Sequence, residues 1–207
     1  YLYTRYYKGL ADVLTAALDR AGQLMAAAEA LDERLESSGL SADQRFMIAH
    51  ATHSYYGSTE LLEAEGRPLW VVNEGEYCMM NTLDLAVDQV FWELDRNPWV
   101  VRNLLDTFVK RHSYVDEVKA GPDARCPGGV SFCHDMGAHN NFAPPGRSSY
   151  ELANLSGTFS YMTQEQLCNW ILTAGCYIAK TRDAGWLGRN RKVIEACFSS
   201  MINRGGD

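Results

Sequence analysis

Apolar residues recur at steps of three and four over much of this chain, and this spacing constrains its fold more than any other feature. In the first segment the series comprises Leu10, Val13, Leu14, Ala17, Leu18, Ala21, Leu24, Met25, Ala28, Leu31 and Leu35. Such steps place apolar side chains on one face of an α-helix. The same period returns at residues 83–94, 101–109, 167–178 and 193–201. The pattern predicts a series of amphipathic helices.

Start and stop signals divide this pattern into separate helices. Gly39 ends the first segment, and Ser41 with Gln44 forms a capping box that starts a second helix, which runs to about residue 56. Thr163 with Gln166 predicts a second capping box. Pro98 ends one helix and separates it from the next, because the residue before a proline avoids the α region.

Two short runs, residues 69–72 and 130–133, are apolar and read as extended chain. The stretch from about residue 116 to 161 is rich in proline and glycine and is expected to be mostly loop. A loop of this length in a compact domain is usually functional or disordered, and its aromatic residues favour an ordered, functional one. The whole chain is therefore expected to be all-α, an array of helical hairpins with long loops.

Composition excludes several classes of protein. The chain has 207 residues, of which 46% are hydrophobic and 11% aromatic, enough apolar material to form a folded core. The formal net charge is −7, and no long Lys/Arg cluster is present, which disfavours a nucleic-acid partner. No apolar run approaches the roughly 18–20 residues that a membrane-spanning helix needs, so no membrane partner is expected.

Two acidic residues are the first candidates for chemistry. Glu74 and Glu76 flank Gly75 at the end of the extended run. A carboxylate held there could act in the cleavage of a glycosidic bond, which needs one nucleophile or base and one acid. On spacing alone, two solvated loop acids explain the pattern better.

A second candidate is the pair His134-Asp135, which follows the other extended run. Both side chains offer directional hydrogen bonds that suit sugar hydroxyls, although a structural role is the alternative. His50 and His53, and the cluster of Cys133, His134 and His139, do not have the spacing of a familiar zinc site. We therefore expect no metal and no cofactor.

Several blocks of the sequence resemble glycoside hydrolase family 52, the β-xylosidases. The first blocks are residues 71–77, with the motif Asn-Glu-Gly-Glu-Tyr, and residues 79–85. The others are residues 97–99, 131–137, 148–152 and 162–167. The blocks follow one another in the order of the family, and the resemblance covers roughly residues 66–204.

This resemblance implies a catalytic (α/α)6 barrel, which in the family follows an N-terminal β-sandwich domain. Residues 1–207 are then expected to form a partial barrel domain of antiparallel helical hairpins. The resemblance implies that the β-sandwich domain and the C-terminal part of the barrel lie outside this chain. Both ends are expected to be cut, because the sequence has no initiator Met and stops just after an amphipathic segment. Glu74 and His134-Asp135 are expected to converge on one end of the helices.

The resemblance also implies a retaining glycoside hydrolase. Such an enzyme would remove xylose from the non-reducing end of xylo-oligosaccharides through a covalent glycosyl-enzyme intermediate. Glu74 matches the catalytic nucleophile of the family, although a similar Asn-Glu pair elsewhere among retaining glycosidases carries the acid, which is the alternative role. The residues expected to bind the substrate are Asn73, Tyr77, Asp84, His134 and Asp135.

One part of the family pattern has no counterpart in the sequence. The general acid of the family is an Asp in a Thr/Tyr-rich segment, and it is expected to lie beyond Asp207. The chain alone is therefore expected to lack useful activity.

The expected partner is a xylo-oligosaccharide or an aryl β-xyloside, and the full-length protein is expected in the cytoplasm, with a homodimer as one expected assembly. The alternative is a non-catalytic α-helical binding or interaction domain, for which composition and periodicity alone suffice. A glycosidase needs Glu74 in a concave pocket with aromatic walls, such as Trp70, Tyr77 or Trp99, whereas an interaction domain would leave Glu74 on an open surface.

Overall fold

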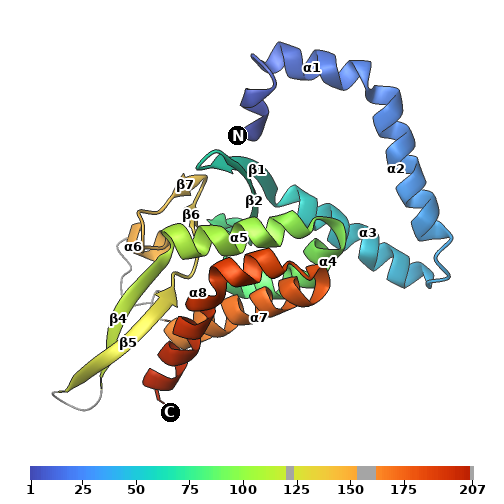
Figure 1. Cartoon of the computed structure of the whole chain (residues 1–207). Helices are drawn as coiled ribbons and strands as arrows, with labels where there is room; N and C mark the ends of the chain where they lie inside the picture. Colours follow the sequence, from blue (N-terminus) through green and yellow to red (C-terminus); the bar gives the residue numbers. More distant parts are fainter. Residues whose placement is uncertain (120–123, 153–161, 206–207) are drawn as a thin grey trace. The chain divides into compact units, whose positions relative to one another are not determined.

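The structure is a computed structural model that describes residues 1–119, 124–152 and 162–205 (Figure 1). It divides into two compact units, Tyr1–Pro68 and Leu69–Asp207. Within the described residues, no helix has the length and apolar character needed to cross a membrane.

Helices dominate the first unit. Its elements are η1 (Leu2–Arg5), α1 (Leu10–Asp19), α2 (Ala21–Glu36), α3 (Ala42–Gly57) and β1 (Thr59–Ala64). The long first helix expected from the apolar series is divided at Arg20, which lies between α1 and α2. The capping box of α3 is confirmed: the Gln44 backbone N–H donates to Ser41 Oγ at 3.2 Å, and the Ser41 N–H donates to Gln44 Oε1 at 3.0 Å.

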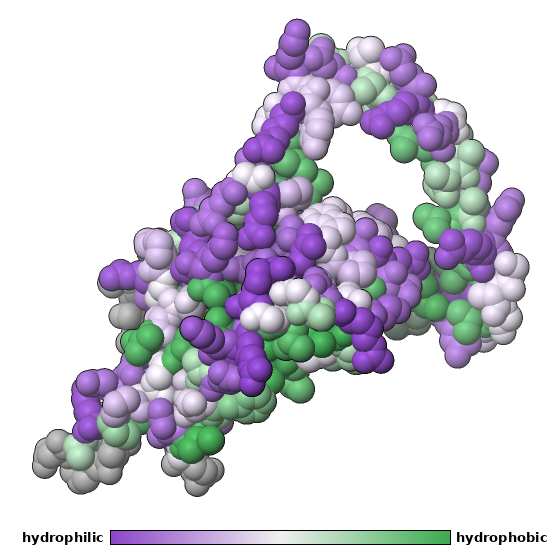
Figure 2. Space-filling model, in the orientation of Figure 1, coloured by the Kyte–Doolittle hydropathy of each residue, from purple (hydrophilic) through white to green (hydrophobic). Residues whose placement is uncertain are grey.

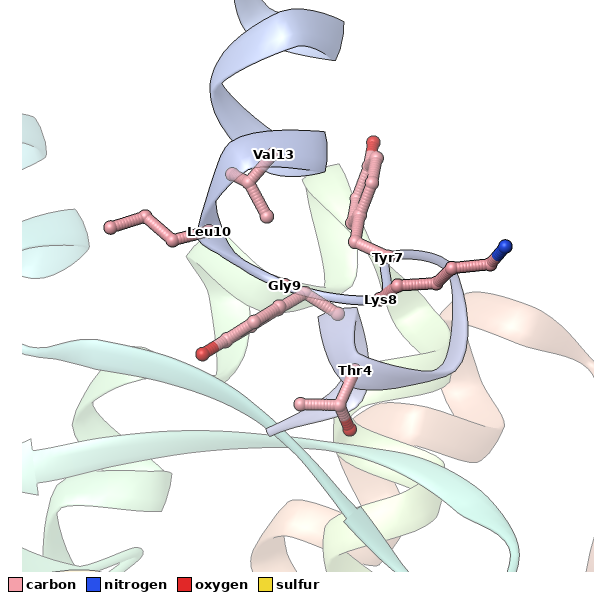
Figure 3. A pocket seen from close by; sticks show the side chains of 7 residues that line it. Thr4, Tyr7, Lys8, Gly9, Leu10 and Val13 are labelled. Carbon is pink, nitrogen blue, oxygen red and sulfur yellow. The ribbon is translucent and has the colours of Figure 1, made fainter.

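The apolar stripes of these three helices stay accessible. No residue of α1, α2 or α3 is buried, and Leu10, Leu18, Phe46 and Met47 are well exposed. Figure 2 shows hydrophobic side chains interspersed with hydrophilic ones along this part of the chain. A pocket of about 530 Å³ lies between Tyr3 and Val13, lined by Tyr7, Lys8 and neighbouring side chains (Figure 3). It contains none of the residues that the sequence singles out for chemistry.

The second unit is built on four long helices. They are α4 (Leu83–Arg96), α5 (Pro98–Arg111), α7 (Thr163–Thr181) and α8 (Ala184–Asn203). α4 packs against α5 and α7, and α7 also packs against α5 and α8 (Figure 1). Pro98 occupies the first turn of α5, where its missing N–H has no helical partner to lose. The Asp183 carboxylate caps α8 by accepting from the Trp186 N–H at 2.8 Å.

Aromatic rings connect these helices to one another. Phe132 stacks on Trp170 with ring centroids 5.1 Å apart, and Trp170 lies 6.1 Å from Trp186. Phe108 and Tyr177 extend the series through edge contacts with Phe132 and Trp186. Phe108, Trp170 and Trp186 are fully buried, so this aromatic series forms the centre of the hydrophobic core.

The described residues also form two antiparallel sheets. The strand order of the first sheet is β1-β2-β3-β6-β7, and the division between the units falls within β2. Its strands from β2 onward are β2 (Arg67–Glu74), β3 (Met79–Met80), β6 (Gly137–Ala138) and β7 (Asn141–Phe142). The second sheet pairs β4 (Ser113–Lys119) with β5 (Arg125–Phe132), on which α8 packs. The remaining elements are η2 (Gly75–Tyr77) and α6 (Ser149–Leu152).

The expectation of an all-α fold is wrong, because these sheets make the chain mixed α/β. Strands β3, β6 and β7 contain only two residues each, too few for a period-two pattern to appear in the sequence. Of the two apolar runs read as extended, residues 69–72 lie in β2, and residues 130–132 lie in β5. The capping box expected at Thr163 is also wrong, since α7 begins without a side-chain cap.

The stretch of residues 116–161 was expected to be mostly loop, and this too is wrong for its described part. Gly128 and Gly129 lie inside β5, where the register with β4 shifts between Asp116 and Glu117. A Cβ at Gly128 would lie 2.4 Å from Asp116 Oδ1, and Gly129 has a φ of +104°. The register shift is a β-bulge, and glycine inside a strand is typical of a bulge. The two glycines therefore indicate an irregular hairpin and not a loop.

Gly137 provides a test of the hairpin formed by β6 and β7. Its φ is +136°, and an added Cβ would lie 2.0 Å from the Asn141 backbone O. We expect Gly137→Ala to lower the free energy of unfolding of the second unit by at least the roughly 1–3 kcal/mol of a strained backbone position. Gly175→Ala in α7 is the control, because nothing lies within 4 Å of its Cβ position. Denaturant titration of both variants measures the difference, and equal stability would contradict the strain.

Candidate functional site

The site candidates meet where β2, β3 and β6 lie side by side. β2 pairs with β3 so that Glu74 lies opposite Met79, and Met79 lies opposite Ala138 of β6. Neighbouring strands are about 4.8 Å apart, so this register brings the end of β2 close to the segment that enters β6. His134 and Asp135 belong to that segment, and the Met136 N–H donates to the Met80 carbonyl at 2.9 Å.

Asn81 holds the end of β2 in this position. Its Oδ1 accepts from the Val72 N–H at 2.8 Å, and its Nδ2 donates to the Trp70 carbonyl at 3.1 Å. The Asn81 backbone N–H donates to the Val72 carbonyl at 2.9 Å. Asn81 has a φ of +51°, a left-handed conformation that Asn tolerates better than most residues. One buried side chain therefore fixes the strand that carries Glu74.

α4 starts directly after Asn81 and brings Asp84 to the same site. The N–H of Leu83, the first residue of α4, donates to the His134 carbonyl at 3.1 Å. Asp84 lies in the first turn of α4 and is half-buried. This single backbone hydrogen bond links the helix that carries Asp84 to the segment that carries His134.

The Asp135 carboxylate is completely buried and fully hydrogen-bonded. Its Oδ1 accepts from the Gly137 N–H at 2.7 Å and from the Ser149 N–H at 2.8 Å. Its Oδ2 accepts from Ser149 Oγ at 2.7 Å and from His134 Nδ1 at 2.9 Å. The edge of the His134 ring also meets the neighbouring Tyr150 ring, with centroids 5.1 Å apart at 67°. Two segments distant in sequence, residues 134–137 and α6, thus converge on one carboxylate.

Electrostatics couple the acids of this site. Burial raises the pKa of Glu74, the charge of Asp84 raises it further, the charge of His134 lowers it, and the charge of Asp135 raises it. Burial acts to lower the pKa of His134, but the hydrogen bond to Asp135 and the charges of Asp135, Asp84 and Glu74 raise it overall. The surroundings of His134 therefore favour its cationic form, in a site that otherwise contains carboxylates.

Three buried oxygen atoms of the site have no hydrogen-bond partner within the described part of the chain. They are Asn73 Oδ1, Glu74 Oε2 and Asp84 Oδ1. All three are acceptors, so they can bind groups that donate, such as the hydroxyls of a sugar. No group of three or more His, Cys, Asp or Glu side chains among residues 1–119, 124–152 and 162–205 is arranged to hold a metal ion.

The structure brings together most of the residues that the sequence singles out. Glu74, Asp84, His134 and Asp135 influence one another's charge, and Asn73 immediately precedes Glu74 on β2. Tyr77 is 62% exposed and lies in η2. The side chain of Glu76 lies outside what the structure describes.

Sequence reasoning gave no role to three residues that build the site: Asn81, Ser149 and Tyr150. All three lie in blocks that carry the family resemblance. Membership of these blocks was the one sequence signal that could have pointed to them. Of the aromatic walls expected around Glu74, Trp70 is half-buried on β2 and Trp99 half-buried on α5. Tyr150 was not among them, although the charge of Glu74 is one of the influences that raise its pKa, after burial.

Comparison with known proteins shows the family of the chain. The sequence profile of glycosyl hydrolase family 52 matches residues 1–177. Two proteins of Geobacillus stearothermophilus named beta-xylosidase are each 50% identical to the chain over 205 residues, or 99% of it. The chain spans 29% of the length of one and 33% of the other. The similarity thus includes the first 65 residues, which lie outside the motif blocks that carry the family resemblance.

Replacement of Asn81 tests its control of β2. Asn81→Ala removes three side-chain hydrogen bonds, with Val72, Trp70 and Met136. A buried group left without its partner costs about 1–3 kcal/mol. We expect a loss of stability of at least that size, with Asn81→Asp intermediate because its carboxylate still accepts from Val72. Thermal unfolding followed by circular dichroism measures the order of the variants. Wild-type stability in Asn81→Ala would show that the strand does not depend on this side chain.

Proposed function

Because the chain belongs to glycosyl hydrolase family 52, we propose that it carries one part of the active site of a retaining β-xylosidase, with Glu74 as nucleophile. The proposed substrates are xylo-oligosaccharides, from which xylose is removed at the non-reducing end, and aryl β-xylosides. The observation that carries the proposal is the Glu74 carboxylate, held at the end of β2 with one buried oxygen lacking a partner. Its chemistry fits the names of the two relatives.

The proposed reaction has two displacement steps at the anomeric carbon. In the first, a Glu74 carboxylate oxygen forms an ester bond to that carbon while the glycosidic C–O bond breaks. The leaving oxygen takes a proton from a general acid outside the described site. In the second, water attacks the same carbon, the deprotonated acid takes up the proton of the water, and Glu74 leaves as a carboxylate.

The other site residues have proposed roles in holding the sugar. Asn73 and Asp84 offer buried acceptors without partners, which suit the donating hydroxyls of xylose. Tyr77 is exposed and could form an aromatic wall. His134 supplies a positive charge that lowers the pKa of Glu74 and so favours the ionised form that a nucleophile needs. Asp135 has no oxygen left for a ligand, and its proposed contribution runs through His134.

One observation favours a second role for Glu74, that of the acid/base. Burial and the charge of Asp84 raise its pKa, as expected for a carboxyl that must carry a proton. The alternative of a non-catalytic helical domain is disfavoured, because the chain is mixed α/β and half identical to named enzymes. The location in the cytoplasm and the homodimer stay predictions.

Glu74→Gln in the full-length protein tests the role of the nucleophile. The amide is nearly isosteric but is a poor nucleophile, so we expect turnover to fall by about 10⁴–10⁶-fold, the range seen when a nucleophile is removed. The fold should persist, as circular dichroism can verify. Asp88→Asn is the matched control, because Asp88 is an exposed carboxylate on α4, one turn from Asp84, and its loss should leave the rate unchanged.

The configuration of a rescued product separates the two roles of Glu74. With Glu74→Ala, azide can take the place of the missing nucleophile, and an activated aryl xyloside should give the xylosyl azide with inverted configuration. A product with retained configuration would assign Glu74 as the acid/base instead.

The chain expressed by itself should have little xylosidase activity. It contains Glu74, but the resemblance implies no general acid, whose contribution is typically about 10²–10⁴-fold. Phe91, Val115 and Ile202 are each at least 75% exposed in the second unit, so the isolated chain should also associate. An aryl β-xyloside assay with light scattering measures both. Turnover at the rate of a full-length relative by a monodisperse monomer would refute the proposal.

A further inference from the structure

We propose that Asp135 is a positioning residue, which fixes the His134 imidazole beside Glu74 and does not itself contact the sugar. The inference rests on the proposed function, because it concerns the environment of the proposed nucleophile. It changes the role expected for Asp135 from the family resemblance, where it was a substrate-binding residue.

The hydrogen bonds of Asp135 leave it no capacity for a ligand. Each carboxylate oxygen already accepts two hydrogen bonds, from Gly137 and Ser149 at Oδ1 and from Ser149 and His134 at Oδ2. The residue is also 0% exposed. A carboxylate so enclosed can influence chemistry only through a neighbour, and His134 is the one titratable group among these three partners.

The contacts of His134 fix the orientation and the tautomer of its ring. An ionised carboxylate can only accept, so the 2.9 Å bond to Asp135 requires a proton on His134 Nδ1. The backbone of His134 is held by the N–H of Leu83, and its ring meets the Tyr150 ring. Nε2 is then the ring nitrogen left for chemistry. The residue is only 5% exposed, so its surroundings decide the protonation state of the ring.

Titratable groups from several elements surround this pair. They are Glu74 of β2, Asp84 of α4, His112 after α5, Cys133 after β5 and Tyr150 of α6. Burial lowers the pKa of His112 to about 4, so His112 carries no charge near neutral pH. Burial raises the pKa of Tyr150, so its hydroxyl is neutral as well. Within the described residues, His134 is thus the one basic group of this set whose pKa is raised, which favours its cationic form.

Asp135 has two opposite effects on Glu74, and this gives the inference a sharp test. Its own negative charge raises the pKa of Glu74. Through His134 it acts the other way, because it keeps His134 cationic, and the positive charge lowers the pKa of Glu74. The influence of His134 on Glu74 exceeds that of Asp135, so the indirect effect should win.

The experiment compares Asp135→Asn in two backgrounds of the full-length protein. For each variant, the pH dependence of kcat/KM is measured with an activated aryl xyloside, and the acid limb reports ionisation of the nucleophile. In the wild-type background, Asp135→Asn should move the acid limb to higher pH, because burial then leaves His134 neutral. In the His134→Gln background, the same change should move the limb to lower pH, because only the negative charge is lost. His139→Gln, an exposed histidine of the β6–β7 turn, is the control and should move nothing.

The sign of the shift decides the outcome. A downward shift in both backgrounds would show that Asp135 acts directly by its charge, and no shift in either would show no action on Glu74; each overturns the inference. The tautomer of His134 gives a second test that needs no folded Asp135→Asn variant. Nitrogen-15 spectra of wild-type protein, assigned with His134→Gln, should show Nδ1 protonated above the pKa of the ring. A proton on Nε2 there would also overturn the inference.

Covalent trapping keeps this test separate from the proposed function. A 2-deoxy-2-fluoro xyloside with a good leaving group slows the second step and leaves the nucleophile labelled. If peptide mass analysis finds the label on another residue, the proposed function fails. If Glu74 carries the label but the acid limbs do not shift as described, the role of Asp135 alone is wrong.

Discussion

The rest of the site depends on the hydrogen bonds between the Asn81 side chain and the backbone of β2. It satisfies backbone groups of β2 at Trp70 and Val72, and its backbone makes a third bond to the same strand. The next residues open α4, whose first N–H binds the His134 carbonyl. One polar residue in a left-handed conformation therefore sets the strand with Glu74 and the helix with Asp84 at a fixed spacing. A buried polar group needs a hydrogen-bond partner, so a substitution at Asn81 would leave backbone groups of β2 without one.

The sequence predicted the helices well because their signals are local. The apolar series of α4, α5 and α7 repeats over three or more turns, and the capping box at Ser41 requires only neighbouring residues. The two sheets were missed for the opposite reason. Strands of two residues have no periodicity. Gly128 and Gly129 made β5 look like a loop in the sequence, although both glycines lie where β5 pairs irregularly with β4. Pairing between distant segments leaves no trace in one stretch of sequence.

The same distinction applies to the site. Glu74 and His134-Asp135 were found because they end short apolar runs and match family motifs. Ser149 and Tyr150 received no role, because their partners lie about fourteen residues upstream and only folding reveals the contact. The hydrogen-bond state of Asp135 was equally hidden: an acid in a motif suggests a ligand contact, whereas four donors around it give it an internal function. Motifs locate such a residue, but its burial determines what it can touch.

The aromatic series of the core has a consequence for spectroscopy. All five tryptophans of the chain, Trp70, Trp92, Trp99, Trp170 and Trp186, belong to the second unit, and the first unit has none. Intrinsic tryptophan emission therefore reports the second unit alone, while the first unit contributes only tyrosine signal. Trp170 and Trp186 lie close enough for their excited states to couple, and Phe132 fixes one ring of the pair by stacking on Trp170. The near-ultraviolet circular dichroism of that pair therefore reports whether α7 and α8 are packed against each other.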